Sequence, residues 1–214
     1  MNNLFIEGLA LNASLILGLG AQNIFVLNAG LHKQSPLLVA TVCSLCDLIL
    51  IFIGVWGAAS FFIQFPLLKV VVGILGVFFL LFYAIQKIRE GLKTGVIEEL
   101  KDNQQSMSRK KAILLALSFS ILNPHVYLDT VILIGGFAAK YTSMQNRLWF
   151  GFGAASFSTL WFFSIASLAF LFSRFLTTPR ALRIINLSAG IVLSLLCLKL
   201  GKEVYLWIQQ ITFQ

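Results

Sequence analysis

Two carboxylates lie inside apolar stretches of this chain, and they are the residues most able to do chemistry. Asp47 is the only charged residue between Leu37 and Phe62, and Asp129 lies in a second stretch that is otherwise uncharged. An ionised carboxylate at the centre of a bilayer costs about 2.5–3.5 kcal/mol by insertion scales. Such a residue is retained where it binds an ion, moves a proton or holds a cationic substrate. Asp47 and Asp129 are therefore the first candidates for a functional site.

Helix-weakening residues lie in two of the apolar stretches. Pro124, upstream of Asp129, removes a backbone donor and is predicted to break its helix, and Gly18 and Gly20 lower helix stability in the first stretch. Freed backbone groups at membrane depth persist only where they line a cavity or are buried in protein. Ordinary kinks, with polar residues bonding between helices, are the alternative interpretation. The polar side chains beside the two weak points complete the candidate site: Gln22, Asn23, Asn123 and His125.

The composition indicates an integral membrane protein with one compact helical domain. Apolar residues make up 58% of the 214 residues and charged residues 11%, whereas soluble domains carry roughly 25% charged residues. The net charge of +8 is interpreted as orientation signals and lipid contacts rather than as a nucleic-acid surface. Crossing the hydrocarbon core takes about 20 residues. Six apolar stretches reach this length, at 4–28, 37–62, 67–86, 112–139, 148–173 and 184–207.

The basic residues and the long polar segment predict the topology. Eleven of the sixteen Lys and Arg residues lie in the connections after the first, third and fifth stretches, which the positive-inside rule places in the cytoplasm with both termini outside. A polar loop, 87–111, separates two halves of three stretches each, 1–86 and 112–214. Related halves with an odd number of spans must be inverted, and such transporters form their sites from broken helices. We therefore predict an all-α integral membrane protein of six transmembrane helices in two inverted repeats, with broken first and fourth helices.

The residues of the candidate site resemble the motifs of the LysE-type amino-acid exporters, and the resemblance covers the whole chain. The run Gly18–Val26 resembles the family's G-P-Q-N signature, and Asp47 resembles its second-helix aspartate. The run Leu122–Thr130 resembles the L-N-P-H-x-Y-x-D segment of the branch that exports basic amino acids. Ala21 stands where the family more often has proline, so the sequence supports a break at Pro124 more strongly than one in the first stretch.

The resemblance implies efflux of arginine, lysine or similar cationic amino acids across the bacterial cytoplasmic membrane. It also implies a secondary transporter, not an enzyme, with no cofactor and with the proton gradient or the membrane potential as its driving force. The expected partners are the cationic substrate, protons and membrane lipid, with no nucleic acid. The chain agrees in having no G-x-x-x-x-G-K-[ST] loop for a nucleotide.

Other functions stay open at this point. An exporter of neutral amino acids, of the RhtB type, would share the fold. A membrane thiol-disulfide carrier could use Cys43 and Cys46, although the other half supplies only Cys197. A passive channel would need an oligomer to build a ring of like charges. A stripe of small residues around Gly151 and Ala155 lets a helix approach closely, either within one chain or in a homodimer.

Overall fold

A computed structural model describes residues 2–16, 20–58, 66–93, 107–176 and 179–212. All of the regular secondary structure in these ranges is helical. The helices are α1 (Asn2–Ile16), α2 (Ala21–Leu31), α3 (Pro36–Ile53), α5 (Pro66–Lys93), α6 (Arg109–Ile121), α7 (Pro124–Tyr127), α8 (Gly135–Ala138), α9 (Met144–Leu176) and α10 (Pro179–Thr212), with π-helical segments η1 (Gly54–Ala58) and η3 (Leu128–Ile134).

Three helices of the described chain are long and apolar enough to cross a membrane: Pro36–Gly57, Met144–Ser173 and Arg183–Gln210. Two bent helix pairs raise the number to five if each pair is one span. Gly57, with φ of 104°, ends the first of these spans in a conformation that suits glycine. The end of the predicted stretch 37–62 lies outside the described residues. Lys199, Lys202 and Glu203 do not interrupt the last helix, which continues to Thr212.

Both bent pairs change direction where the sequence predicts a weak helix. The axes of α1 and α2 differ by 82°. Helix α6 makes an angle of 59° with the continuous helical run Pro124–Ala138, which consists of α7, η3 and α8. Gly20 and Asn123 precede the second helices and are extended, with ψ of 160° and 102°. Asn123 is held there because a residue before proline avoids the helical region. The first bend is the larger although Ala21 replaces the family's usual proline; Gly18 lies outside the described residues.

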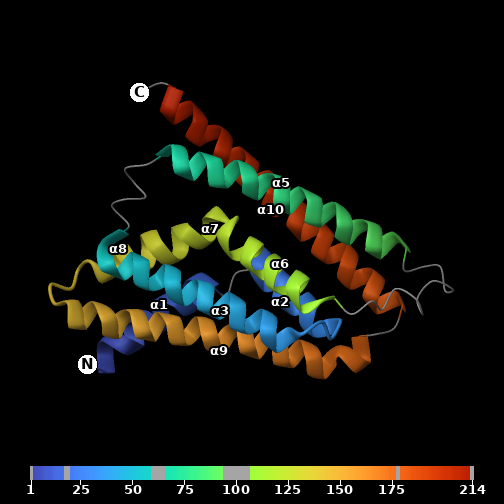
Figure 1. Cartoon of the computed structure of the whole chain (residues 1–214), viewed down its shortest axis with the longest axis horizontal. Coiled ribbons are helices and arrows are strands. Elements are labelled where there is room, and N and C mark those ends of the chain that lie inside the picture. The colour runs from blue at the N-terminus through green and yellow to red at the C-terminus, as the bar shows by residue number, and fades with distance from the viewer. Residues whose placement is uncertain (1, 17–19, 59–65, 94–106, 177–178, 213–214) are drawn as a thin grey trace.

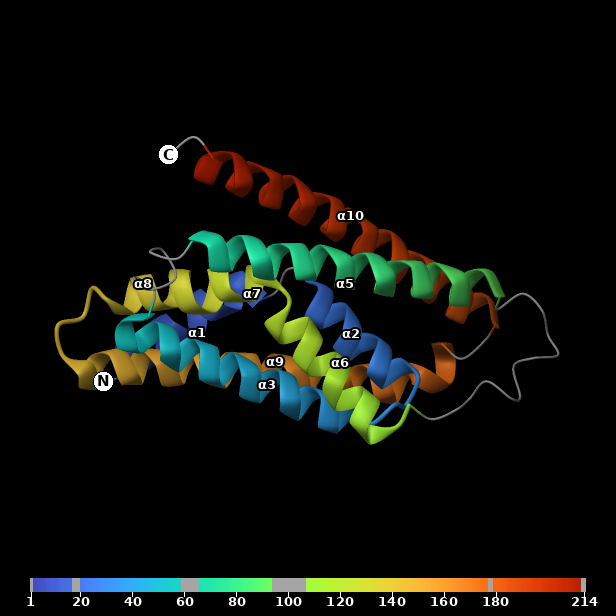
Figure 2. The ribbon, with the colours of Figure 1, turned by 45° about the horizontal axis from the view of Figure 1, so that its top comes forward.

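The helices form two paired layers with the bent helices between them. Helix α5 packs along α10, and α3 packs along α9 (Figures 1 and 2). Helices α1 and α2 both pack on α9, while α6 and η3 pack on α3. Each bent pair therefore lies against the long helix of the opposite half of the chain.

Gly8 of α1 and Gly153 of α9 let the backbones of these two helices approach closely. A Cβ atom on Gly8 would overlap the backbone carbonyl of Phe150, and one on Gly153 would overlap that of Phe5. Gly151, in the small-residue stripe, faces Phe52 and Val55. These residues of α9 therefore pack within the chain, against α1 and against the end of α3.

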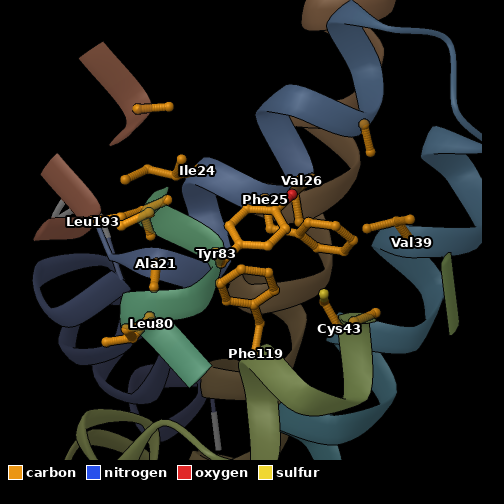
Figure 3. Packing of buried hydrophobic residues seen from close by; sticks show 14 of the residues in the cluster. Ala21, Ile24, Phe25, Val26, Val39, Cys43, Leu80, Tyr83, Phe119 and Leu193 are labelled. Carbon is orange, nitrogen blue, oxygen red and sulfur yellow. The ribbon is translucent and has the colours of Figure 1, made fainter. Parts of the chain in front are cut away.

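The core centres on an aromatic cluster of Phe25, Phe79, Tyr83 and Phe119. The rings of Phe25 and Phe119 are stacked with centroids 4.8 Å apart, and Tyr83 meets Phe119 edge-on at 4.7 Å. Figure 3 shows Phe25, Tyr83 and Phe119 facing one another from three helices. Edge-on and offset rings are the favoured geometries, so this cluster ties α2, α5 and α6 together.

The helix ends that flank the basic connections lie at one end of the bundle. The start of α1 and the end of α10 lie at one end in Figure 1, and the junctions α2–α3, α5–α6 and α9–α10 lie at the other. This placement is the one that the positive-inside pattern requires of the three basic connections.

Candidate functional site

A cavity of about 360 Å³ opens between the two bent pairs, α3 and the α5–α10 layer. Its volume lies in the range of small-molecule sites, roughly 300–1,000 Å³. The structure brings seven of the eight predicted site residues to this cavity, and Pro124 lies beside it as the first residue of α7. The lining residues are Asn12, Leu15, Ile16, Gly20, Ala21, Gln22, Asn23, Asp47, Leu80, Asn123, His125, Val126, Asp129, Thr130, Leu196 and Lys199.

Asp47 is the most enclosed charge of the site, with 3% of its surface exposed. Its Oδ2 accepts a hydrogen bond from Ser158 Oγ at 2.9 Å, and its Oδ1 accepts a longer one from Gln22 Nε2 at 3.5 Å. Asn12 Nδ2 donates to Ser158 Oγ at 2.9 Å, and Gln22 also donates to Ser120 Oγ at 3.0 Å. Donors to an ionised acceptor give the stronger hydrogen bonds, so this network holds the carboxylate in one orientation.

Sequence reasoning missed Asn12, Ser120 and Ser158. Each is a polar residue in an apolar helix and is buried, with 3% or less of its surface exposed. The sequence could have indicated them only through the general rule that a polar side chain buried in an apolar helix needs a hydrogen-bond partner. Small hydroxyl residues are common in membrane helices, however, and nothing local to Ser158 indicates a partner 111 residues away.

Asp129 occupies a different setting from Asp47. It is half-buried on the π-helical segment η3. It has no hydrogen bond or ion pair with any residue in the described ranges. Its neighbour Thr130 donates to Val126 O of the preceding helix α7 at 2.6 Å. Because π-helical turns are frequent at functional sites, the open setting of Asp129 suits a group that meets a ligand directly.

The starts of α2 and α7 both reach the cavity, but only one is capped. Asn123 Oδ1 accepts from the backbone N–H of His125 at 3.2 Å, its carbonyl accepts from Val126 N at 3.1 Å, and Pro124 has no N–H. The first amides of α7 are therefore satisfied within α7. Gly20 has no side chain to cap α2, so the amides of Ala21 and Gln22, which line the cavity, receive no side-chain cap at the start of this helix.

Two side chains connect the site to its surroundings. Asn23 Nδ2 donates to Ile16 O at 2.8 Å and so ties the start of α2 to the last residue of α1. His125 lines the cavity, and its Nε2 lies 3.7 Å from Glu203 Oε2 of α10. This contact becomes an ion pair only when His125 is protonated. Among the described residues, no three His, Cys, Asp or Glu side chains come together to hold a metal ion.

One end of the cavity is closed by packed side chains. Ala21 and Leu80 belong both to its lining and to the core around the aromatic cluster. Beyond that cluster, Lys87 Nζ donates to Glu90 Oε2 at 2.8 Å and to Asn186 Oδ1 at 3.4 Å. Burial lowers the pKa of the nearby His32. The cavity is thus separated from the end that carries the basic connections.

Comparison with known proteins agrees with these observations. Residues 13–203 match the family described as LysE type translocator. The arginine exporter protein ArgO of Salmonella schwarzengrund (strain CVM19633) is 38% identical over 203 residues, which is 95% of each chain. Proteins of the same name from Salmonella enteritidis PT4 and Salmonella typhimurium LT2 are 37% identical over the same share. No solved structure matches the chain.

Proposed function

Because this chain belongs to the LysE type translocator family, we propose that it exports arginine and related basic amino acids across the bacterial inner membrane. The resemblance found in the sequence is confirmed, and the chain is a multi-pass membrane protein of a family of transporters. The observation that carries the proposal is the cavity between the bent helices, where Asp47 and Asp129 face a space of small-molecule size. Two carboxylates suit a substrate with an α-ammonium group and a cationic side chain.

The architecture proposed for this function is six spans in two inverted repeats. Helix α5 would be the sixth span, since it has 28 residues and runs along α10. The second helices of the two bent pairs begin at Ala21 and Pro124, after the extended residues Gly20 and Asn123. Each bent pair also packs on the long helix of the other half. These corresponding features support a pseudo-two-fold relation of the halves, with both termini outside.

Coupling follows from the energetics of moving a cation outward. Export against an inside-negative potential costs about 2.3 kcal/mol per charge for each 100 mV. A proton that enters as the substrate leaves would offset this cost. Asp47 and Asp129 are the groups proposed to take the substrate cations and the coupled proton, and the imidazole of His125 lines the same cavity.

The substrate can be tested with the purified protein in liposomes loaded with labelled arginine, lysine, citrulline or leucine. Arginine and lysine should leave faster than citrulline, which has the shape of arginine without its charge, and faster than leucine. A pH gradient, acid outside, should increase arginine efflux if protons are exchanged. Protein-free liposomes give the background. Equal rates for leucine and arginine would instead indicate a neutral amino-acid exporter.

The hydrogen bond from Ser158 to Asp47 should matter for transport. We expect Ser158→Ala to lower the initial rate of arginine efflux by roughly 10-fold or more, since a hydrogen bond to a charged group is worth about 1.5–3 kcal/mol. Ser156→Ala is the matched control, because Ser156 is exposed on the same helix and bonds only to Phe152 O. Equal rates for the two variants would show that Ser158 does not orient Asp47 for transport.

A further inference from the structure

Lys199 is a cation that faces the cavity from near the middle of a membrane span. It lies on α10 within the candidate span Arg183–Gln210 and lines the cavity together with Leu196. An ionisable residue at such a depth is costly and is by default a candidate for function. Lys199 and Lys202, three residues later, are both exposed, but only Lys199 lines the cavity. The position of Lys199 therefore differs from that of a lysine that only anchors the helix at the interface.

Within the part of the chain that the structure describes, the ammonium group of Lys199 interacts electrostatically with Asp129 and His125 of the same cavity. No ion pair and no hydrogen bond joins it to another described residue. Glu203, one turn further along α10, lies against His125 instead. By contrast, the buried Lys87 is paired with Glu90. Lys199 thus keeps its donors for something that enters the cavity.

The charges of the cavity complement those of a basic amino acid. The lining holds two carboxylates, Asp47 and Asp129, and one ammonium, Lys199, besides the imidazole of His125. Arginine or lysine carries two cationic groups and one carboxylate. Without Lys199, the α-carboxylate would enter a space whose fixed charges are all negative, and like charges at short range repel strongly where water is excluded.

The helix starts alone do not supply this positive charge. The first amides of α7 are already bonded to Asn123, which leaves the uncapped start of α2 as the remaining backbone donor. Its partial positive charge is about half an elementary charge. Lys199 contributes a full charge to the cavity lining, from a helix that belongs to the α5–α10 layer.

We propose that Lys199 binds the α-carboxylate of the substrate and so selects amino acids over the corresponding decarboxylated amines. This inference rests on the proposed function, in which Asp47 and Asp129 take the two cationic groups. The amides of Ala21 and Gln22 at the start of α2 assist as further donors. Lys199 also links substrate binding to the α5–α10 layer, because the carboxylate bridges that layer and the bent helices.

The test compares binding of arginine with binding of agmatine, which is arginine with its carboxylate replaced by hydrogen. Wild-type protein in detergent should bind arginine more tightly than agmatine. Lys199→Met should weaken arginine binding on the order of 10- to 100-fold, the range for a lost hydrogen bond to a charged group. The same variant should bind agmatine as well as the wild type, or better, since a repelling charge is gone. Lys199→Arg should keep the preference for arginine, and Lys202→Met is the matched control.

Each result decides between the possibilities. If Lys199→Met weakened the binding of arginine and agmatine equally, Lys199 would have a structural role and the proposal would be overturned. Any result that leaves the ratio of the two affinities unchanged would also overturn it. A wild type that binds agmatine as tightly as arginine would overturn it as well. Lys199→Gln replaces Lys199→Met if the latter does not fold, as judged by its elution and thermal unfolding. Failure of the wild type to bind either ligand would instead refute the proposed export of basic amino acids.

Discussion

Replacing Asp47 with asparagine is expected to abolish arginine efflux while leaving the protein folded. In the proposed complex Asp47 pairs with a cationic group of the substrate, and removing one partner of such a buried charge pair costs about 2–5 kcal/mol, a loss of roughly 30- to 1,000-fold or more. Asparagine keeps the shape of the side chain, and its one carbonyl oxygen can still accept the hydrogen bond from Ser158. The initial rate of efflux from proteoliposomes and the unfolding temperature in detergent are the two measurements.

Glu7, a carboxylate outside the cavity, provides the control for Asp47. Glu7 accepts from Lys140 Nζ at 2.9 Å and from Tyr141 Oη at 2.5 Å, away from the cavity. Exposed pairs of this kind contribute about 0–1 kcal/mol, so Glu7→Gln should transport at close to the wild-type rate. If Asp47→Asn also exported arginine at that rate, Asp47 would be a structural residue and the site proposed here would be wrong.

Replacing Pro124 with alanine is expected to reduce arginine efflux by roughly 10-fold or more. Proline keeps Asn123 out of the helical region and leaves the helix without one donor. Alanine removes both constraints, so α6 can continue into α7 and reduce the 59° bend. A straighter helix would turn Asn123, His125 and Asp129 away from the cavity that they line. Efflux rates and arginine binding by the purified variant measure the loss.

A proline at an ordinary helix start provides the matched comparison. Pro36 is the first residue of α3, where proline is well tolerated and breaks no span. Pro36→Ala should therefore keep most of the activity. Normal transport by Pro124→Ala would mean that the side-chain cap of Asn123 maintains the break without the proline.

Much of this protein follows from local features of its sequence. Long apolar stretches predict membrane helices because a lipid core leaves the backbone no other partner for its hydrogen bonds. Pro124 predicts a break through its missing N–H, and Asp47 and Asp129 predict a site through the cost of their charges. The motif around Asn123 also identified the family before any geometry was known. Each of these arguments needs only a residue and its neighbours along the chain.

The tertiary structure alone decided which distant groups meet. Ser158 reaches Asp47 across 111 residues, and Asn12 reaches Ser158 across 146; no local pattern indicates such a pairing. Asn123 caps α7 while Gly20 gives α2 no side-chain cap, which depends on the backbone path at each break. Lys199 faces the cavity while Lys202 does not, because the rotation of α10 against α5 sets its direction. Packing fixes these relations through space, so the sequence named the two carboxylates of the site but neither Lys199 nor the arrangement that makes the charges complementary to a substrate.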